Sequence, residues 1–491
     1  MTVHSGSVRF RCGVPETEFQ PMSRDVKTDI VIVGAGISGL ATAYYLQNHG
    51  FDTRILEKGE RTGGTIRTRT TDGFLVEEGP NSALDTTPLL HGLFEGTGAD
   101  ESLEYAGANA KNRYIVRNGR LNNLPMNPLA FLRSPLFSAS AKLRLLKEPF
   151  VRPSDPRVDE TVADFVRRRL GSEFLDYAIN PFVAGVYAGD PERLSVSSSF
   201  PKLRELEQNY GSLIKGAVRG ARARKKRGTA SKQSARMFSF HGGMQEMIEA
   251  VTRVQADKVH TGVRIDAIRR EPVGFAVETR FGGEATRFLT RVLVLAVPAH
   301  AYGGLPMHLD FPIRGDLGKI EYPPVAMVFF GYRRSPAKTP LDGFGFLVPK
   351  KERRNILGTI WNSSIFSGRA PDGGAALTTF IGGTRQPESV TLSDGRLVDS
   401  VRQDLLELMG IDEPPDVVSI KRWEKAIPQY GMEHGRIIGA IEAFERDCPG
   451  LFVTGNFRGG ISVADCVIQS HATAERVTAE LSRRHAETSN V

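Results

Sequence analysis

The sequence predicts a mixed α/β protein, with α+β parts, that is organised around a nucleotide-binding unit near its beginning. Residues 30–33 are four consecutive β-branched residues, as in a parallel strand covered on both faces, and glycines follow at 34, 36 and 39. A second strand, glycine loop and helix pattern starts at residue 450, and residues 302–437 alternate apolar runs with turns. We therefore expect a discontinuous Rossmann-like domain and a second domain with a mixed sheet.

The three glycines form a G-x-G-x-x-G fingerprint. Gly34 permits a tight turn, Gly36 lets the backbone approach a pyrophosphate, and Gly39 lets the next helix pack close to its strand. The helix is expected from Ser38 to His49, and the phosphates would lie at its N-terminus, where free N–H groups favour negative charge. The pattern thus predicts a dinucleotide site.

The residues after this helix extend the prediction. A second strand is expected over residues 53–56, and Glu57 at its end is placed to accept hydrogen bonds from both ribose hydroxyls, which argues against a 2′-phosphate. Arg61 and the pair Gly63 and Gly64 would reach a diphosphate from the other side. The alternative is an ordinary βαβ unit that binds no nucleotide.

The tandem of fingerprint, Glu57 and the R-x-G-G motif at 61–64 resembles the flavoprotein superfamily of amine oxidases, phytoene desaturases and protoporphyrinogen oxidases. The resemblance implies that the dinucleotide is FAD. It is expected without a covalent link, because residues 455–460 hold no counterpart of the tethering Cys of some amine oxidases. The helix from about Ser462 to Leu481 would point its N-terminus at the pyrimidine end of the flavin.

Carried over position by position, the resemblance gives a full set of cofactor contacts. They are Gly34, Ala35, Gly36, Ile37, Ser38, Gly39, Glu57, Lys58, Arg61, Gly63, Gly64, Thr65, Gly79, Pro80, Asn81, Val263, Ala296, Gly455, Asn456, Gly460, Ile461 and Val463.

Further segments resemble the protoporphyrinogen oxidase family in particular. They are residues 78–81, 112–114, 181–185, 188–191, 240–244, 343–349 and 379–383, within a similarity that covers roughly residues 28–480. The expected FAD-binding domain comprises residues 28–105, 238–300 and 438–485, with a substrate domain at 301–437. Residues 106–200 are expected to form a helical subdomain that associates with membranes, and residues 201–237 a connection with a basic loop.

The resemblance also implies a substrate site for a flat, acidic tetrapyrrole. Arg113 would pair with a propionate, and Asn81 would lie near both flavin and substrate. Phe380 would stack on a pyrrole ring, opposite Leu347 and Ile360, where the family is expected to have leucine in place of Ile360. The backbone at Ala184 and Gly185 would accept pyrrole N–H groups. Taken alone, Arg113 reads more simply as a surface residue of a hairpin at 112–119.

No side chain acts as catalyst in this interpretation, and no metal is expected. Flavin N5 would take hydride from a meso bridge of protoporphyrinogen IX in three rounds, and oxygen would regenerate the flavin with release of hydrogen peroxide. Coproporphyrinogen III is the alternative substrate. An amine oxidase is less favoured because residues 323–329 lack lysine, and a desaturase because it has little use for Arg113. A flavin-binding scaffold without activity is the non-enzymatic alternative. His241 is expected to pack or to form hydrogen bonds.

The net charge of +8 is local, since residues 201–236 hold 11 Lys or Arg against 2 Glu. Residues 222–227 are expected to be a solvated loop, and the absence of interleaved aromatics there argues against nucleic acid. An anionic membrane surface is the better partner. Residues 129–137 and 142–146 mix large apolar side chains with cations, which suits an interfacial helix or a helix that faces protein core.

The remaining features concern compartment and assembly. The three cysteines are scattered, as in a reducing compartment, and no apolar run reaches the eighteen or so residues of a spanning helix. The first 27 residues look like a loose leader and not a secretory signal. We expect a location in the cytoplasm or on the cytoplasmic face of a membrane. The oligomeric state, a homodimer included, stays open.

Overall fold

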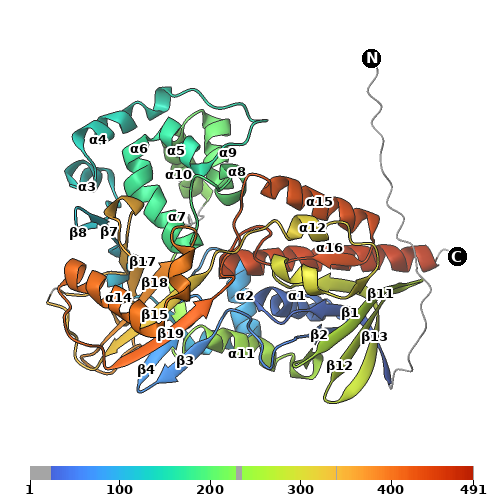
Figure 1. Ribbon diagram of the computed structural model, residues 1–491. Helices are drawn as coiled ribbons and strands as arrows, with labels where there is room; N and C mark the ends of the chain where they lie inside the picture. Colours follow the sequence, from blue (N-terminus) through green and yellow to red (C-terminus); the bar gives the residue numbers. More distant parts are fainter. Residues whose placement is uncertain (1–23, 228–234, 339, 490–491) are drawn as a thin grey trace.

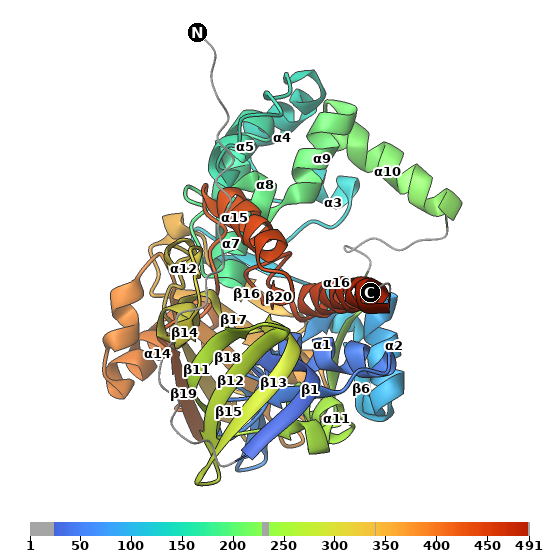
Figure 2. The same ribbon diagram turned by 90° about the vertical axis from the view of Figure 1, so that its right-hand side faces the viewer.

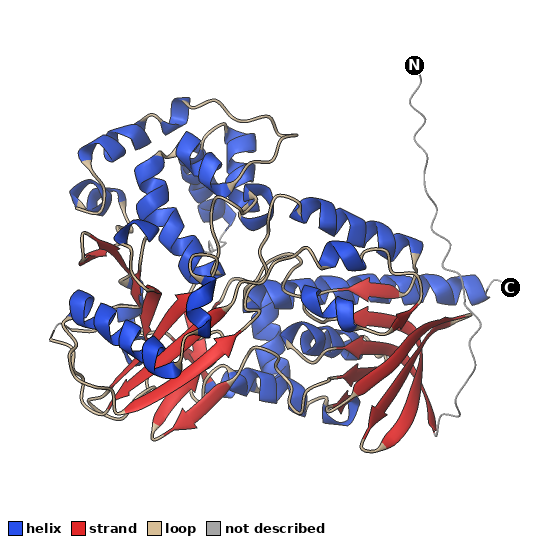
Figure 3. Ribbon diagram, in the orientation of Figure 1, coloured by secondary structure: helices blue, strands red, loops and turns tan. Residues whose placement is uncertain are grey.

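The computed structural model describes residues 24–227, 235–338 and 340–489. Two sheets stand side by side, and helices lie over both (Figures 1 and 3). The predicted mixed α/β class is therefore confirmed.

The first sheet has eight strands, in the order β10-β2-β1-β13-β12-β11-β14, and β20 pairs with β13. The strands are β1 (Arg24–Val33), β2 (Thr53–Leu56), β10 (Val259–His260), β11 (Arg264–Glu271), β12 (Gly274–Phe281), β13 (Glu284–Leu295), β14 (Met307–His308) and β20 (Leu451–Val453). β1 is parallel to both β2 and β13, and β20 is parallel to β13. The expected return of later strands to the first sheet is confirmed.

Helices cover both faces of this sheet. One face packs against α1 (Ile37–Asn48), α2 (Pro88–Thr97), α11 (Gln245–Arg253) and α16 (Val463–Ser489), and the other against α12 (Arg314–Leu317) and α15 (His434–Asp447). Ile30 and Ile32 of β1 point into the first layer, whereas Val31 and Val33 point into the second. This double coverage explains why the strand is apolar without alternation. α16 continues beyond its expected end at Leu481.

The second sheet has the order β19-β15-β18-β17-β16-β7-β8. Its strands are β7 (Tyr114–Arg117), β8 (Arg120–Asn123), β15 (Val325–Tyr332), β16 (Gly345–Leu347), β17 (Ile356–Trp361), β18 (Ala375–Gly382) and β19 (Val417–Trp423), and α14 (Asp394–Met409) packs on it. β16 and β7 are parallel and the other pairs antiparallel, so the predicted mixed sheet is confirmed.

The hairpin expected at residues 112–119 is β7 and β8. Asn118 and Gly119 form its turn with positive φ angles of 53° and 68°, as a type I′ turn requires. The hairpin joins the second sheet and not the helices that follow it in the chain. Residues 106–200, expected to form a helical subdomain, therefore include two strands of the second sheet.

Two small sheets complete the strands. They consist of β3 (Thr68–Thr71) with β4 (Phe74–Glu77), and of β5 (Ala83–Leu84), β9 (Met237–Phe240) and β6 (Leu103–Tyr105). Phe74 and Val76 alternate with polar neighbours in the sequence, as in a half-exposed edge strand, but all four residues of β4 are buried. Phe74 packs against Phe329 of β15. Strand β4 therefore lies between the domain of the first sheet and the domain of the second sheet.

A helical unit lies above the second sheet (Figure 1). Its longer helices are α3 (Pro128–Arg133), α4 (Ala139–Leu146), α5 (Val162–Arg169), α7 (Asn180–Tyr187), α9 (Pro201–Tyr210) and α10 (Leu213–Arg227), with shorter turns at α6 (Ser172–Phe174) and α8 (Val196–Ser199). Arg169 is fully buried and bridges Glu148 and Glu207 with contacts of 3.1 and 2.7 Å. Glu148 also accepts the N–H groups of Leu213 and Ile214. This network fixes α5, α9 and α10 together.

The basic segment 222–227 is not a loop, so that expectation is wrong. It forms the end of α10, which extends away from the other helices of the unit (Figure 2). Alanine, arginine and lysine all favour helix, and this preference outweighs the effect of the neighbouring glycines. The Gly- and Ser-containing stretch at 228–234 lies outside the described residues.

Candidate active site

Three loops meet at the carboxyl edge of the first sheet. They follow β1, β13 and β20, and they are held there by backbone hydrogen bonds. Gly34 N–H donates to Leu56 O (2.8 Å), Ala296 N–H to Val33 O (2.8 Å), and Thr454 N–H to Leu295 O (2.9 Å). In α/β sheets ligands bind at this edge, so the parallel strand register places the predicted glycine loops together.

Gly34 and Gly39 have the structural roles that the sequence predicts. Gly34 has a φ of +103°, and a Cβ there would lie 2.8 Å from Ala296 O. A Cβ on Gly39 would lie 1.9 Å from Gly34 O, so only glycine lets α1 pack this closely. At Gly36, in contrast, a Cβ would have no heavy atom within 4 Å. The open space in front of Gly36 is what a pyrophosphate would fill.

The second glycine pair lies directly against the first loop. Gly63 N–H donates to Ala35 O at 2.7 Å, and a Cβ on Gly64 would lie 3.4 Å from Gly36 Cα. Arg61 behaves differently from the prediction, because its guanidinium donates to the carbonyls of Thr62 (2.9 Å), Ile66 (3.0 Å) and Gly64 (2.6 Å). It braces the loop from within, and burial lowers its pKa.

Glu57 lies at the end of β2, beside the fingerprint. Its Oε2 accepts the N–H of Ala35 at 2.7 Å and its Oε1 accepts the N–H of Gly59 at 2.8 Å. Val263 N–H donates to the Glu57 carbonyl at 2.8 Å. A carboxylate has about four lone-pair positions, so the fixed side chain can still accept hydrogen bonds from ribose hydroxyls.

The other predicted cofactor residues frame the same place. Lys58, Gly64 and Thr65 are exposed around it. A Cβ on Gly79 would lie 2.0 Å from Thr65 O, so the segment with Gly79 and Pro80 packs tightly on the second glycine loop.

The closing loop ends in a second helix N-terminus. Ser462 caps α16: its hydroxyl accepts the N–H of Asp465 (3.1 Å) and donates to that carboxylate (2.7 Å). Further along α16, Ser470 donates to the carbonyl of Ser38 in α1 at 2.9 Å, so the two helices run side by side (Figure 1). The loop residues Asn456, Gly460 and Ile461 and the first helical residue Val463 thus follow the same sheet edge as the fingerprint.

One face of the second sheet carries the predicted apolar substrate contacts. Leu347 and Phe380 both pair with Gly358, one on each side, and Ile360 is two residues further along that strand. Directly paired residues and residues two apart share a face, so the three side chains lie together. All three are partly exposed within a largely buried sheet. This is a surface that a flat apolar ring could cover.

Helix α7 packs on this face. A Cβ on Gly185 would lie 2.3 Å from Leu347 Cδ2, and Ala184 beside it is buried. The small residues of 180–191 suggest a close approach to a ligand or another helix, and in the structure Gly185 approaches strand β16.

A buried hydrogen-bond chain joins the nucleotide side to this face. Asn362 donates through Nδ2 to Asn81 Oδ1 at 2.6 Å, and Thr378 donates to Asn362 Oδ1 at 2.8 Å. Trp423 Nε1 donates to the Glu78 carbonyl at 2.7 Å. Asn81 therefore links the segment that packs on the second glycine loop with the second sheet.

Arg113 directly precedes β7, and its guanidinium lies over the Phe344 ring at 5.7 Å. Burial lowers its pKa. Within the part of the chain that the structure describes, no carboxylate pairs with it. Although its neighbours desolvate part of the guanidinium, Arg113 as a whole is exposed. A guanidinium without a counter-ion among the described residues is available to an anionic ligand.

Other residues were not foreseen. Tyr430 and His434 pack against the closing loop and are almost fully buried, yet nothing in their local sequence indicates this. His241 is exposed, with its ring 3.9 Å from Glu104, and its backbone carbonyl accepts from Arg369 at 3.1 Å. It lies at the surface and does not pack.

The family model described as flavin-containing amine oxidoreductase matches residues 37–478. The chain belongs to this family. The open space at Gly36, at the N-terminus of α1, leaves room for a phosphate group. The protein is thus a flavin-dependent oxidoreductase.

Three relatives refine the comparison. Protoporphyrinogen oxidase 2, chloroplastic/mitochondrial, of Arabidopsis thaliana is 33% identical over 483 residues, covering 92% of this chain and 94% of the relative. Coproporphyrinogen III oxidase of Bacillus subtilis is 28% identical and covers 91% of this chain and 97% of the relative. A crystal structure from Exiguobacterium sp. 255-15, provisionally named a protoporphyrinogen oxidase, superposes with a TM-score of 0.76 at 26% identity, covering 94% of this chain and 100% of that one. The resemblance to protoporphyrinogen oxidases is confirmed.

The glycine geometry predicts opposite effects for two matched substitutions. Gly36→Ala should fold normally, because Gly36 has a φ of −71° and open space around it, but should bind flavin about tenfold more weakly or worse. Gly39→Ala should lower stability by about 1–3 kcal/mol through its clash with Gly34 O. Thermal unfolding of the flavin-free proteins and titration with FAD measure both effects. Normal flavin affinity in Gly36→Ala would show that a pyrophosphate does not lie against Gly36.

Proposed function

We propose that this flavoenzyme uses FAD and oxygen to oxidise protoporphyrinogen IX to protoporphyrin IX in heme biosynthesis. The observation that carries the proposal is the exposed guanidinium of Arg113, which has no counter-ion among the described residues and lies beside an apolar sheet face. An acidic, flat, apolar tetrapyrrole complements both features. The similarity to plant protoporphyrinogen oxidases over 92% of the chain supports the same substrate.

In this proposal, the residues of the chain bind and orient the tetrapyrrole substrate. Arg113 would hold one propionate, while Phe380 would stack on a pyrrole ring and the neighbouring Leu347 and Ile360 side chains of the same sheet face would contact the macrocycle. The backbone of α7 at Ala184 and Gly185 would accept pyrrole N–H groups. When bound, FAD supplies hydride acceptance at N5, and oxygen restores it with formation of hydrogen peroxide. No side chain of the chain needs to act as an acid or base in this scheme.

Coproporphyrinogen III is the second candidate, favoured by the 28% identity to the coproporphyrinogen III oxidase of Bacillus subtilis. The two substrates share the flat ring and differ in the number of carboxylates, and one guanidinium serves either. Steady-state oxygen uptake with each porphyrinogen and with a polyamine tests the proposal. We expect the highest kcat/KM for protoporphyrinogen IX and no turnover of the amine. A preference for coproporphyrinogen III would select the alternative, and turnover of the polyamine alone would refute both.

Flavin binding should be non-covalent. Cys466 lies inside α16, where burial raises the pKa of its thiol to about 11, and the thiolate is the reactive form. Cys448 is also buried. Acid precipitation of the holoenzyme should therefore leave the yellow colour in the supernatant. Colour that stays with the precipitate would show a covalent link.

Arg113→Ala should raise the KM for the porphyrinogen about tenfold to a hundredfold. A charge-assisted hydrogen bond contributes about 1.5–3 kcal/mol, and about 1.4 kcal/mol corresponds to a factor of ten. kcat should fall less, because a propionate lies away from the meso carbon.

Arg113→Lys is the matched control. It keeps the charge without the planar fork, so it should recover part of the loss. Flavin content should stay normal in both variants. An unchanged KM would exclude this role, and an equal loss of flavin would assign Arg113 to the fold instead.

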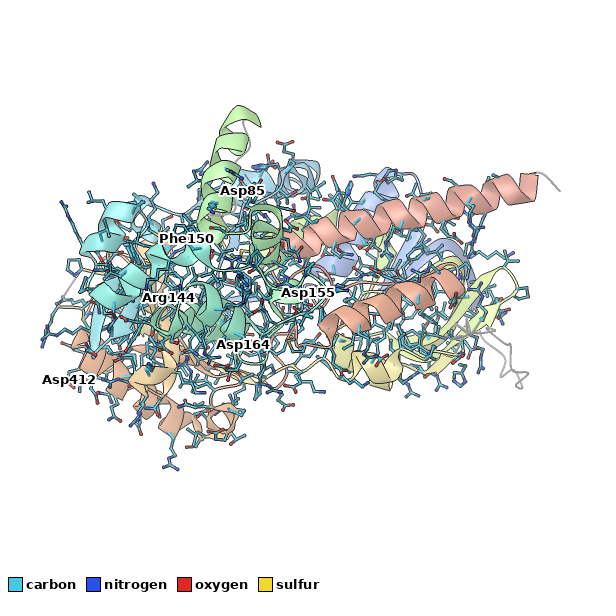
Figure 4. All side chains as sticks on the ribbon, turned by 90° about the horizontal axis from the view of Figure 1, so that it is seen from above. Asp85, Arg144, Phe150, Asp155, Asp164 and Asp412 are labelled. Atoms are coloured by element: carbon cyan, nitrogen blue, oxygen red, sulfur yellow. The ribbon has the colours of Figure 1, made fainter. Side chains whose placement is uncertain are left out.

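We also propose a peripheral membrane contact through the helical unit, which would place the enzyme on the cytoplasmic face of a membrane or in the cytoplasm. No residue of α3 or α4 is buried, and Phe150 after α4 is 85% exposed (Figure 4). Exposed leucines accompany it at positions 129, 132, 143 and 146. Exposed Arg133 and Lys147 add charge that suits anionic lipid. No helix among the described residues is long and apolar enough to span a membrane.

The variant with both Leu143→Ser and Leu146→Ser should bind anionic vesicles at least about tenfold more weakly, because each buried leucine contributes about 1.5–3 kcal/mol. Leu406→Ser is the control, since Leu406 is exposed on α14, outside the helical unit. Vesicle co-sedimentation measures both. Equal binding of the two variants would contradict a lipid-facing surface on α4.

A further inference from the structure

Tyr430 holds the loop that precedes α16. Its hydroxyl donates to the carbonyl of Asn456 at 2.6 Å and accepts the N–H of Gly460 at 3.1 Å. Gly460 has a φ of +135°, a backbone conformation that glycine adopts readily, and it has no side chain that could hold the loop in place. One phenol group therefore closes both ends of the turn that leads into the helix N-terminus.

The backbone around Tyr430 faces the opposite way, toward the helical unit. The Tyr430 carbonyl accepts the N–H of Ser195 at 2.9 Å and the hydroxyl of Ser199 at 3.3 Å. Its neighbour Gln429 donates through Nε2 to the carbonyl of Tyr187, the last residue of α7, at 2.8 Å. Two consecutive residues thus connect the proposed substrate helix with the closing loop.

Burial and ring stacking hold the side chain of Tyr430 in place. Tyr430 and His434 are 3% and 4% exposed, and their rings stack with centroids 4.0 Å apart and planes 10° apart. Burial lowers the pKa of His434 to about 4, so the ring beneath Tyr430 is neutral. The stack fixes the position of the hydroxyl without adding charge near the loop.

We propose that Tyr430 is a positioning residue for the flavin. It holds the first N–H groups of α16 at the cofactor and fixes their position relative to α7. The inference rests on the proposed placement of the flavin at this helix N-terminus. Free N–H groups and the helix dipole favour added negative charge, so a correctly held N-terminus stabilises the reduced cofactor more than the oxidised one. A looser loop should therefore weaken the binding of both the oxidised and the reduced flavin, and it should weaken the binding of the reduced flavin more.

Tyr430→Phe keeps the stacked ring and removes both hydrogen bonds to the loop. In the purified holoenzyme, we expect the Kd for oxidised FAD to rise about tenfold. If the reduced form loses a further factor of ten, the two-electron reduction potential falls by about 30 mV. Tyr332→Phe is the matched control, because Tyr332 is equally buried but lies on β15 in the second sheet. Its Kd and potential should equal those of the wild type.

Both quantities are measured without porphyrinogen, so they stand apart from the substrate assignment. A Tyr430→Phe protein with wild-type Kd and potential overturns the proposal, and so does one that only unfolds at lower temperature. Should Tyr430→Phe fail to fold, Ser199→Ala removes one hydrogen bond to the Tyr430 carbonyl and should shift the potential in the same direction by a smaller amount. A Ser199→Ala potential equal to that of the wild type would overturn it equally.

Discussion

The close approach of backbones at the carboxyl edge of the first sheet is the constraint on which the rest of the structure depends. A Cβ on Gly39 would lie 1.9 Å from the carbonyl of Gly34, so α1 reaches its position only because that residue is glycine. Packed there, α1 presents its N-terminus to the space in front of Gly36, and α16 lies beside it through the bond from Ser470 to Ser38. The N-termini of α1 and α16 thus lie at two places along the same sheet edge.

The second constraint is the connection between the nucleotide side and the apolar sheet face. Hydride transfer needs the two ligands within contact distance, and small displacements are costly for rate. The buried chain from Asn81 through Asn362 to Thr378 joins the two sides with hydrogen bonds of 2.6 and 2.8 Å. Gln429 and Tyr430 make a second connection on the other side of α7. The relative position of the two domains is therefore set by short, directional hydrogen bonds between largely buried polar groups.

Features that depend on local backbone chemistry could be predicted from the sequence. The strand at 30–33, the glycine loops and the turn at Asn118 and Gly119 are of this kind, because the residue type alone restricts the conformation. Contacts made over longer separations, such as those of Tyr430 with residues 456 and 460, could not be predicted. The local contacts of Arg61 with its own loop were missed as well, because its charge was assigned to a diphosphate. Residues 222–227 were mistaken for a loop since their charge was weighed above their helix propensity. The role of Arg113 came from family resemblance, and the structure adds that its charge has no partner among the described residues.

The central claim is that a porphyrinogen delivers its electrons to a flavin held at this edge. Anaerobic mixing of the holoenzyme with protoporphyrinogen IX, followed by the visible absorbance of the flavin, tests it most directly. The account predicts rapid loss of the flavin band with appearance of the porphyrin spectrum, and return of the band when oxygen is admitted. A flavin that stays oxidised with either porphyrinogen, but is bleached by a polyamine, would contradict it.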